Sequence, residues 1–200
     1  MTSREGILGE VKDFLDGLAL DLPLIFQKPA AAARKRVHKH VPYLGREVAL
    51  CVVETPDLSR SEIAQEGDEL ILRRGADRAA PQQVLREWLV DRARETFAER
   101  VAHWAPRIGV TFKRLSIRDQ RTVWGSCTRA GDLSFNWRII MAPPEALDYL
   151  VIHELCHRLE MNHSKRYWAN VAKHCPDWKK QRAWLRDHSR RLKGAVRRAS

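Results

Sequence analysis

Three histidines and one glutamate lie close together in the C-terminal part of the sequence. His153 and His157 are four residues apart, Glu154 stands between them, and His163 follows six residues later. Residues four apart on an α-helix differ by about 40° in direction, so the first two imidazoles can bind the same ion. This His-Glu-x-x-His spacing predicts a metal site with a general base beside it.

A third ligand requires the chain to turn back after the helix. Asn162 tolerates the left-handed conformation that commonly ends a helix, and we expect it to bring His163 under the ion. Three imidazoles at about 2.0–2.1 Å leave a fourth coordination position for water, which is typical of catalytic zinc. We therefore predict Zn²⁺ bound by the three histidines, with Glu154 taking a proton from the metal-activated water.

Hydrophobic periodicity and turn residues predict an α+β fold that positions the motif. Its N-terminal part forms strands and hairpins, followed by a long helix that Pro106 and Gly109 end. The C-terminal part combines a small mixed sheet, the motif helix and two further helices. The expected elements are strands within 41–73, a helix at 81–104, strands at 110–117, 123–124 and 133–141, the motif helix from Pro143-Pro144, and helices after Ser164 and Pro176.

The chain of 200 residues fits one domain with extensions. We expect residues 1–40 to form an N-terminal extension and 41–190 to form one domain. Within that domain, 41–78 is rich in strands and 79–190 carries the motif. Residues 191–200 form a basic tail.

The net charge of +11 is concentrated toward the C-terminus. Residues 165–200 contain twelve Lys or Arg but two Asp, a net charge of +10. Such a region attracts phosphate backbones or acidic partners, so nucleic acid is an alternative partner, although a solvated helix face is the plainer interpretation.

The sequence favours a cytoplasmic protein. No apolar run is long enough to cross a membrane, and Glu5 and Glu10 near the start argue against a signal peptide. The four scattered cysteines suggest free thiols in a reducing compartment. The oligomeric state is not indicated.

Several segments around the motif carry a known pattern: 124–127, 133–138, 142–143, 148–149, 153–157 and 161–164, with 43–46 and 176–177 farther away. They resemble the YgjP-like metallopeptidase family, and the likeness spans about residues 41–188. The resemblance implies a zincin-like domain of a metal-dependent hydrolase, with zinc on His153, His157 and His163 and with Glu154 catalytic. The third-ligand spacing is more distantly similar to that of SprT-like and WLM proteases, which act on proteins crosslinked to DNA.

Two residues of the motif region depart from zinc-protease patterns. Arg158 follows the second histidine, where such helices generally carry an uncharged residue, and we expect it to point to solvent. Glu160 stands where the long metzincin motif has glycine, which argues against membership of that clan.

The resemblance also implies where substrate binds. In zincin-like folds an edge strand near the metal pairs with the substrate backbone, and we place it within 132–140. Asn136, Arg138 and Tyr149 are the candidates for stabilising the oxyanion, and the sequence does not choose among them. Trp124 is a further candidate, because the small residues after it let a substrate approach.

The leading hypothesis is a zinc-dependent hydrolase, specifically a metallopeptidase that cleaves peptide bonds in a protein or peptide substrate. The first alternative is a zinc hydrolase of a non-peptide amide or ester, which the same chemistry allows. The second is a nucleic-acid-associated protein with a structural metal site.

Overall fold

A computed structural model describes residues 36–196, with side chains from Lys39 onward. It confirms the α+β class. Most of the expected extension at 1–40 lies outside the described residues. The elements are β1 (Arg36–Tyr43), β2 (Arg46–Glu54), β3 (Glu62–Glu66), β4 (Glu69–Arg74), α2 (Pro81–Ile108), β5 (Arg114–Arg118), β6 (Gly125–Cys127), β7 (Asp132–Asn136), η2 (Trp137–Met141), α3 (Pro144–Cys156), α4 (Lys165–His174) and α5 (Trp178–Ala195).

The predicted N-terminal strands form a four-stranded sheet in the order β1-β2-β4-β3. β1 pairs antiparallel with β2, β2 pairs parallel with β4, and β3 pairs antiparallel with β4. Leu50 of β2 and Leu70 and Leu72 of β4 are fully buried and face the core. β1 begins at Arg36, so the sheet includes residues ahead of the expected boundary at 41.

Helix α2 is longer than the sequence indicated. Pro106 does not end it, because the helix continues to Ile108 before Gly109 caps it at a φ of 81°. The backbone N–H of Gly109 donates to the carbonyls of Ala105 and Pro106, which satisfies two acceptors of the last turn of the helix. Its buried residues recur at helical spacing: Val84, Leu85, Leu89, Ala93, Phe97, Val101, Ala105 and Ile108.

The second sheet has the order β5-β7-β6, and two expectations about it were wrong. The strand expected at 123–124 lies at Gly125–Cys127. The strand expected at 133–141 ends at Asn136, whose side chain accepts a hydrogen bond from the backbone N–H of Arg138 and so caps the 3₁₀ turn η2.

The substrate-binding edge placed within 132–140 was also wrong. β7 is the central strand, paired parallel with β5 and antiparallel with β6, so its backbone groups are already used on both sides. The edge strands are β5 and β6. Sheet order depends on contacts between distant segments, which the sequence pattern does not encode locally.

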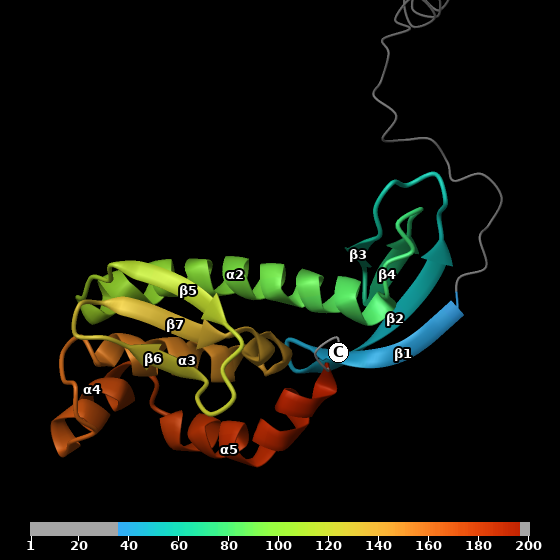
Figure 1. The fold of residues 1–200 in the computed structure, drawn as a ribbon. Helices are drawn as coiled ribbons and strands as arrows, with labels where there is room; N and C mark the ends of the chain where they lie inside the picture. Colours follow the sequence, from blue (N-terminus) through green and yellow to red (C-terminus); the bar gives the residue numbers. More distant parts are fainter. Residues whose placement is uncertain (1–35, 197–200) are drawn as a thin grey trace, which may run out of the picture. The chain divides into compact units, whose positions relative to one another are not determined.

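α2 packs on elements from both sheets and on α3, and α3 in turn contacts α4, α5 and β6 (Figure 1). Phe97 of α2 stacks on Phe135 of β7 with ring centroids 4.4 Å apart. The motif helix therefore lies within the core, and its last turn carries His153 and Glu154. No helix in the described part of the chain is long and apolar enough to span a membrane.

Candidate functional site

The motif helix ends inside the His-Glu-x-x-His motif. α3 runs from Pro144 to Cys156, and His157 is its C-cap with φ −63° and ψ −17°. The backbone N–H groups of His157 and Arg158 donate to the carbonyls of Glu154 and Leu155, so the last turn tightens.

Asn162 does not make the left-handed turn that we expected. Among the described residues, Leu44 and Arg78 are the non-glycine positions with positive φ. The helix has already ended at Cys156, six residues before Asn162, so the tightened turn redirects the chain instead. Asn162 contributes its carbonyl, which accepts a hydrogen bond from the N–H of Ser164 at 2.7 Å.

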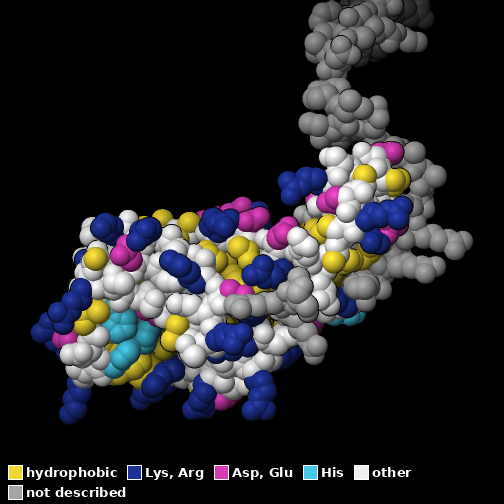
Figure 2. Space-filling view, viewed as in Figure 1, with side chains coloured by type: hydrophobic (Ala, Val, Ile, Leu, Met, Phe, Trp, Pro, Cys, Tyr) yellow, Lys and Arg dark blue, Asp and Glu magenta, His cyan; other side chains and the backbone are white. Residues whose placement is uncertain are grey.

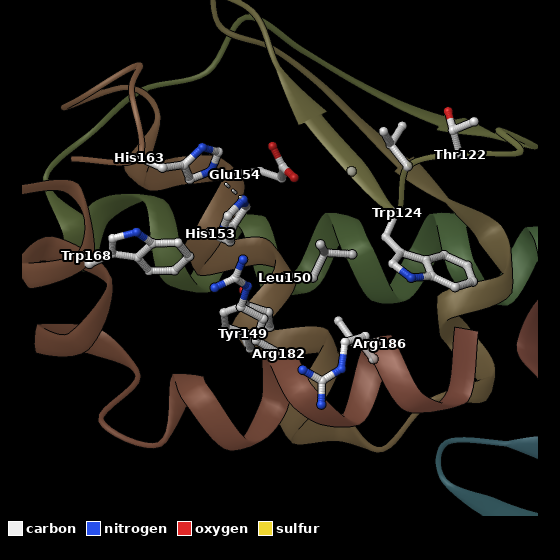
Figure 3. Close-up of a pocket in the computed structure, with 13 residues that line it drawn as sticks. Thr122, Trp124, Tyr149, Leu150, His153, Glu154, His163, Trp168, Arg182 and Arg186 are labelled. Carbon is white, nitrogen blue, oxygen red and sulfur yellow. Dashed lines mark hydrogen bonds between the residues drawn. The ribbon is translucent and has the colours of Figure 1, made fainter. Parts of the chain in front are cut away.

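The three predicted histidines converge. One ring nitrogen from each of His153, His157 and His163 lies within 4.8 Å of the others. The Nε2 atoms of His153 and His163 are 3.3 Å apart, as the dashed line in Figure 3 marks. Two ligands of a tetrahedral ion with bonds of about 2.0–2.1 Å lie roughly 3.3–3.4 Å apart, so the spacing fits one zinc ion.

The surroundings keep these imidazoles neutral, which is the form that binds a metal. Burial, and to a smaller extent the charges of the neighbouring histidines, lowers the pKa of His153 to about 3. Burial also lowers the pKa values of His157 and His163 from their usual range. The site nevertheless reaches the surface, where Figure 2 shows a histidine patch with Lys and Arg side chains around it.

Tyr167 supports two of the three histidines, a role that the sequence did not reveal. Its hydroxyl donates to the carbonyl of His153 at 2.9 Å, and its ring stacks on His157 at 4.7 Å. Ser164 caps α4 as predicted, accepting a hydrogen bond from the N–H of Tyr167. The Nδ1 atom of His157 lies 3.3 Å from the carbonyl of Glu160, which leaves Nε2 for an ion.

Glu154 is buried next to the histidines and against the backbone of β6. It is 4% exposed, and burial raises its pKa to about 8. Gly125 approaches so closely that a Cβ there would lie 2.5 Å from Oε1 of Glu154. The glycine of the Trp-Gly-Ser-Cys segment therefore provides the space that the Glu154 carboxylate occupies.

Gly125→Ala should lower kcat/KM by about 100-fold, since a displacement of about 1 Å at a reacting group has that effect. The added methyl group meets a flexible side chain rather than backbone, so the fold should survive while the carboxylate moves. Circular dichroism and metal content should stay unchanged. Gly194→Ala is the matched control, because a Cβ at Gly194 meets no atom within 4 Å. Unchanged kinetics in Gly125→Ala would contradict this role.

A cavity of about 550 Å³ lies beside the histidines and Glu154 (Figure 3). It is large enough for a peptide segment. Its wall comes from the turn before β6, from α3 and α4, and from α5. The lining residues are Thr122, Val123, Trp124, Gly125, Tyr149, Leu150, His153, Glu154, His163, Trp168, Arg182, Leu185 and Arg186.

Of the three oxyanion candidates, Tyr149 lines this cavity, and Asn136 and Arg138 do not. Asn136 is fully buried, and its Nδ2 donates to the carbonyl of Gln120 at 2.6 Å. Arg138 is 6% exposed; it pairs with Asp119 and donates to the carbonyl of Val196 at 3.2 Å. Both side chains therefore serve the fold around η2.

Arg158 does not point simply to solvent, as the sequence suggested. Its Nε donates to the carbonyl of Thr111 at 3.1 Å, and Nη1 donates to the carbonyl of Arg129 at 2.5 Å. It thereby joins the chain before β5 to the turn between β6 and β7. Arg158 lies just past the helix end and does not line the cavity beside the histidines.

Comparison with known proteins identifies the family. Residues 24–188 match the YgjP-like metallopeptidase domain, a longer span than the sequence resemblance indicated. No curated protein matches the chain. Among solved structures, the metallopeptidase zymogen of Pyrococcus abyssi abylysin is similar at 20% identity and a TM-score of 0.42, covering 47% of this chain and 93% of that one. Because the family match at residues 24–188 covers most of this chain, the chain belongs to the YgjP-like metallopeptidase family.

Proposed function

We propose that this metallopeptidase is zinc-dependent and that His153, His157 and His163 hold the ion. The observation that carries the proposal is the convergence of three neutral imidazoles beside a buried carboxylate in a peptide-sized cavity. Zinc would supply a Lewis acid that polarises the scissile carbonyl and makes water more acidic.

Glu154 acts as the general base. Its burial, which raises its pKa to about 8, makes the carboxylate a stronger base than it would be in water. It takes a proton from the attacking water and passes it to the leaving amine.

Tyr149 is the oxyanion donor that we propose. It lines the cavity, its ring centroid lies 5.8 Å from that of His153, and burial raises the pKa of its phenol to about 12. The phenol therefore stays protonated and can donate a hydrogen bond as negative charge develops on the substrate oxygen.

The substrate is a protein or peptide in this proposal. β6 is an edge strand, and Gly125 at its start lines the cavity. An extended peptide could pair with the free backbone groups of that strand.

We also propose that 41–190 acts as one catalytic domain, supported by a hydrophobic core with members from Val41 to Val196. A cytoplasmic location and nucleic-acid binding by the basic C-terminal region stay predictions.

Metal removal tests the function. The purified protein should contain about one zinc per chain by elemental analysis, and His157→Ala and His163→Ala should lose it. A chelator should stop hydrolysis of a protein and peptide panel, and added zinc should restore it. Folded wild-type protein without zinc, or hydrolysis indifferent to chelation, would refute the proposal. Cleavage of small amides or esters but of no peptide would favour the alternative hydrolase.

A further inference from the structure

Two arginines of α5 line the cavity beside the histidines. Arg182 and Arg186 are one helical turn apart and therefore share a face of the helix. Figure 3 shows both side chains beside the cavity, with that of Arg182 extending toward His153. From the sequence alone, both belong to a basic region for which a solvated helix face is the plainer interpretation and nucleic acid an alternative partner.

Neither arginine is neutralised by the wall of the cavity. In the part of the chain that the structure describes, no carboxylate pairs with Arg182. Arg186 pairs with its neighbour Asp187 at 2.9 Å, and both of those side chains are largely exposed, at 76% and 57%. Glu154 is the single acidic residue that lines the cavity.

The guanidinium of Arg182 is held in a defined place. It lies over the indole of Trp168 at 5.1 Å, and Trp168 itself stacks on Trp178 with centroids 4.1 Å apart. Trp168 also stacks on His163 at 5.5 Å, so one indole sets the position of the guanidinium relative to a proposed zinc ligand. Stacking occupies the face of a guanidinium and leaves its N–H edge free to donate.

A planar cation with free N–H groups beside neutral imidazoles favours an anionic partner. Arg182 lines the same cavity as His153 and His163, so its charge faces the space beside these two histidines. A carboxylate matches the guanidinium fork because it accepts two parallel hydrogen bonds. Such a group on a bound peptide would meet Arg182 close to the bond being cleaved.

We propose that Arg182, assisted by Arg186, binds a carboxylate of the substrate near the scissile bond and so selects acidic peptides. This inference rests on the proposed peptidase function and names its substrate class. The carboxylate has two sources, an Asp or Glu side chain or the free C-terminus of the peptide, and both present the same chemistry.

Binding to zinc-loaded Glu154→Gln protein tests the inference without requiring turnover. The probes are short peptides scanned with Glu or Gln at each position, each with a free or an amidated C-terminus, measured by calorimetry. The best carboxylate-bearing peptide should bind about tenfold more tightly than its neutral counterpart, the effect of one charge-assisted hydrogen bond. Arg182→Gln added to Glu154→Gln should remove that preference.

A control and a charge reversal sharpen the test. Lys180→Gln loses the same charge on the same helix, but Lys180 is exposed and does not line the cavity, so the preference should persist. Arg182→Glu should reverse the preference toward Lys-bearing peptides. In otherwise wild-type enzyme, Arg182→Gln should raise KM for acidic peptides while leaving kcat and zinc content nearly unchanged.

The outcomes separate the inference from the proposed function. If replacing a Glu of the peptide by Gln weakens binding, the carboxylate comes from that side chain. If amidation of the peptide weakens binding, the carboxylate is its free C-terminus. Equal binding of acidic and neutral peptides, or a preference that survives Arg182→Gln, would overturn the inference even if the protein hydrolyses peptides. So would an oligonucleotide that binds more tightly than any acidic peptide through Arg182. Arg182-dependent binding without any hydrolysis would refute the peptidase proposal alone.

Discussion

Glu154→Gln should lower peptide hydrolysis by about 10³-fold, the contribution typical of a general base. The glutamine fills the same volume against Gly125 but cannot take the proton of the attacking water. Zinc content should not change, because the three histidines hold the ion. The variant should fold at least as well as wild type, since the change removes a buried carboxylate whose pKa burial already raises. Hydrolysis rates and elemental analysis on the same preparation check both statements.

Glu160→Gln is the matched control for this variant. Glu160 lies between the second and third histidines in sequence, but its carboxylate pairs with Arg166 at 3.5 Å and does not line the cavity. The hydrolysis rate of the Glu160→Gln protein should stay close to that of wild type. An active Glu154→Gln protein, or equal losses in both variants, would remove Glu154 from the base role.

Arg138→Met should lower the free energy of unfolding by about 3 kcal/mol, because breaking a buried ion pair leaves a charge that is poorly compensated. The side chains of Arg138 and Asp119 are 7% and 17% exposed. Methionine keeps an aliphatic side chain of similar length but loses the ion pair, the hydrogen bond to Val196 and the cation over the Trp137 ring. Asp119 would still form its ion pair with Arg86 at 3.4 Å, which reduces the loss of stability. Urea unfolding measures the change.

Arg114→Met provides the comparison for Arg138→Met. Arg114 of β5 pairs with Asp132 of β7 at 3.4 Å on the surface of the second sheet, and the Arg114 side chain is 73% exposed. An exposed ion pair contributes at most about 1 kcal/mol, so this variant should unfold close to wild type. Similar losses in the two variants would mean that the Arg138 pair is no stronger than a surface contact.

The proximity of the candidate metal-site residues could be predicted because their arrangement is local. His153, His157 and Glu154 lie within little more than one helical turn, so helix geometry alone brings them together. The position of His163 was predicted correctly, although the turn that places it differs from the expected one. Helix α2 was likewise recognisable, because its buried residues recur along one continuous segment.

The rest of the site depends on contacts between distant segments. The close approach of Gly125 to Glu154 arises only when β6 packs beside α3. Arg182 comes to the cavity only because α5 also packs on α3. Asn136 and Arg138 belong to a segment that the resemblance connected with substrate, yet sheet pairing and the η2 turn direct both into the fold. The spacing of residues along the sequence carries no information on which distant segments pack together.

The aromatic walls of the cavity give the molecule an optical property. Trp124 and Trp168 both line the cavity, and each carries a cation over its ring, Lys193 at 4.9 Å and Arg182 at 5.1 Å. Indole emission depends on nearby charge and on exposure to water. A molecule that enters the cavity and engages either cation should therefore change the intrinsic fluorescence spectrum, so the protein reports occupancy of its own cavity without an added label.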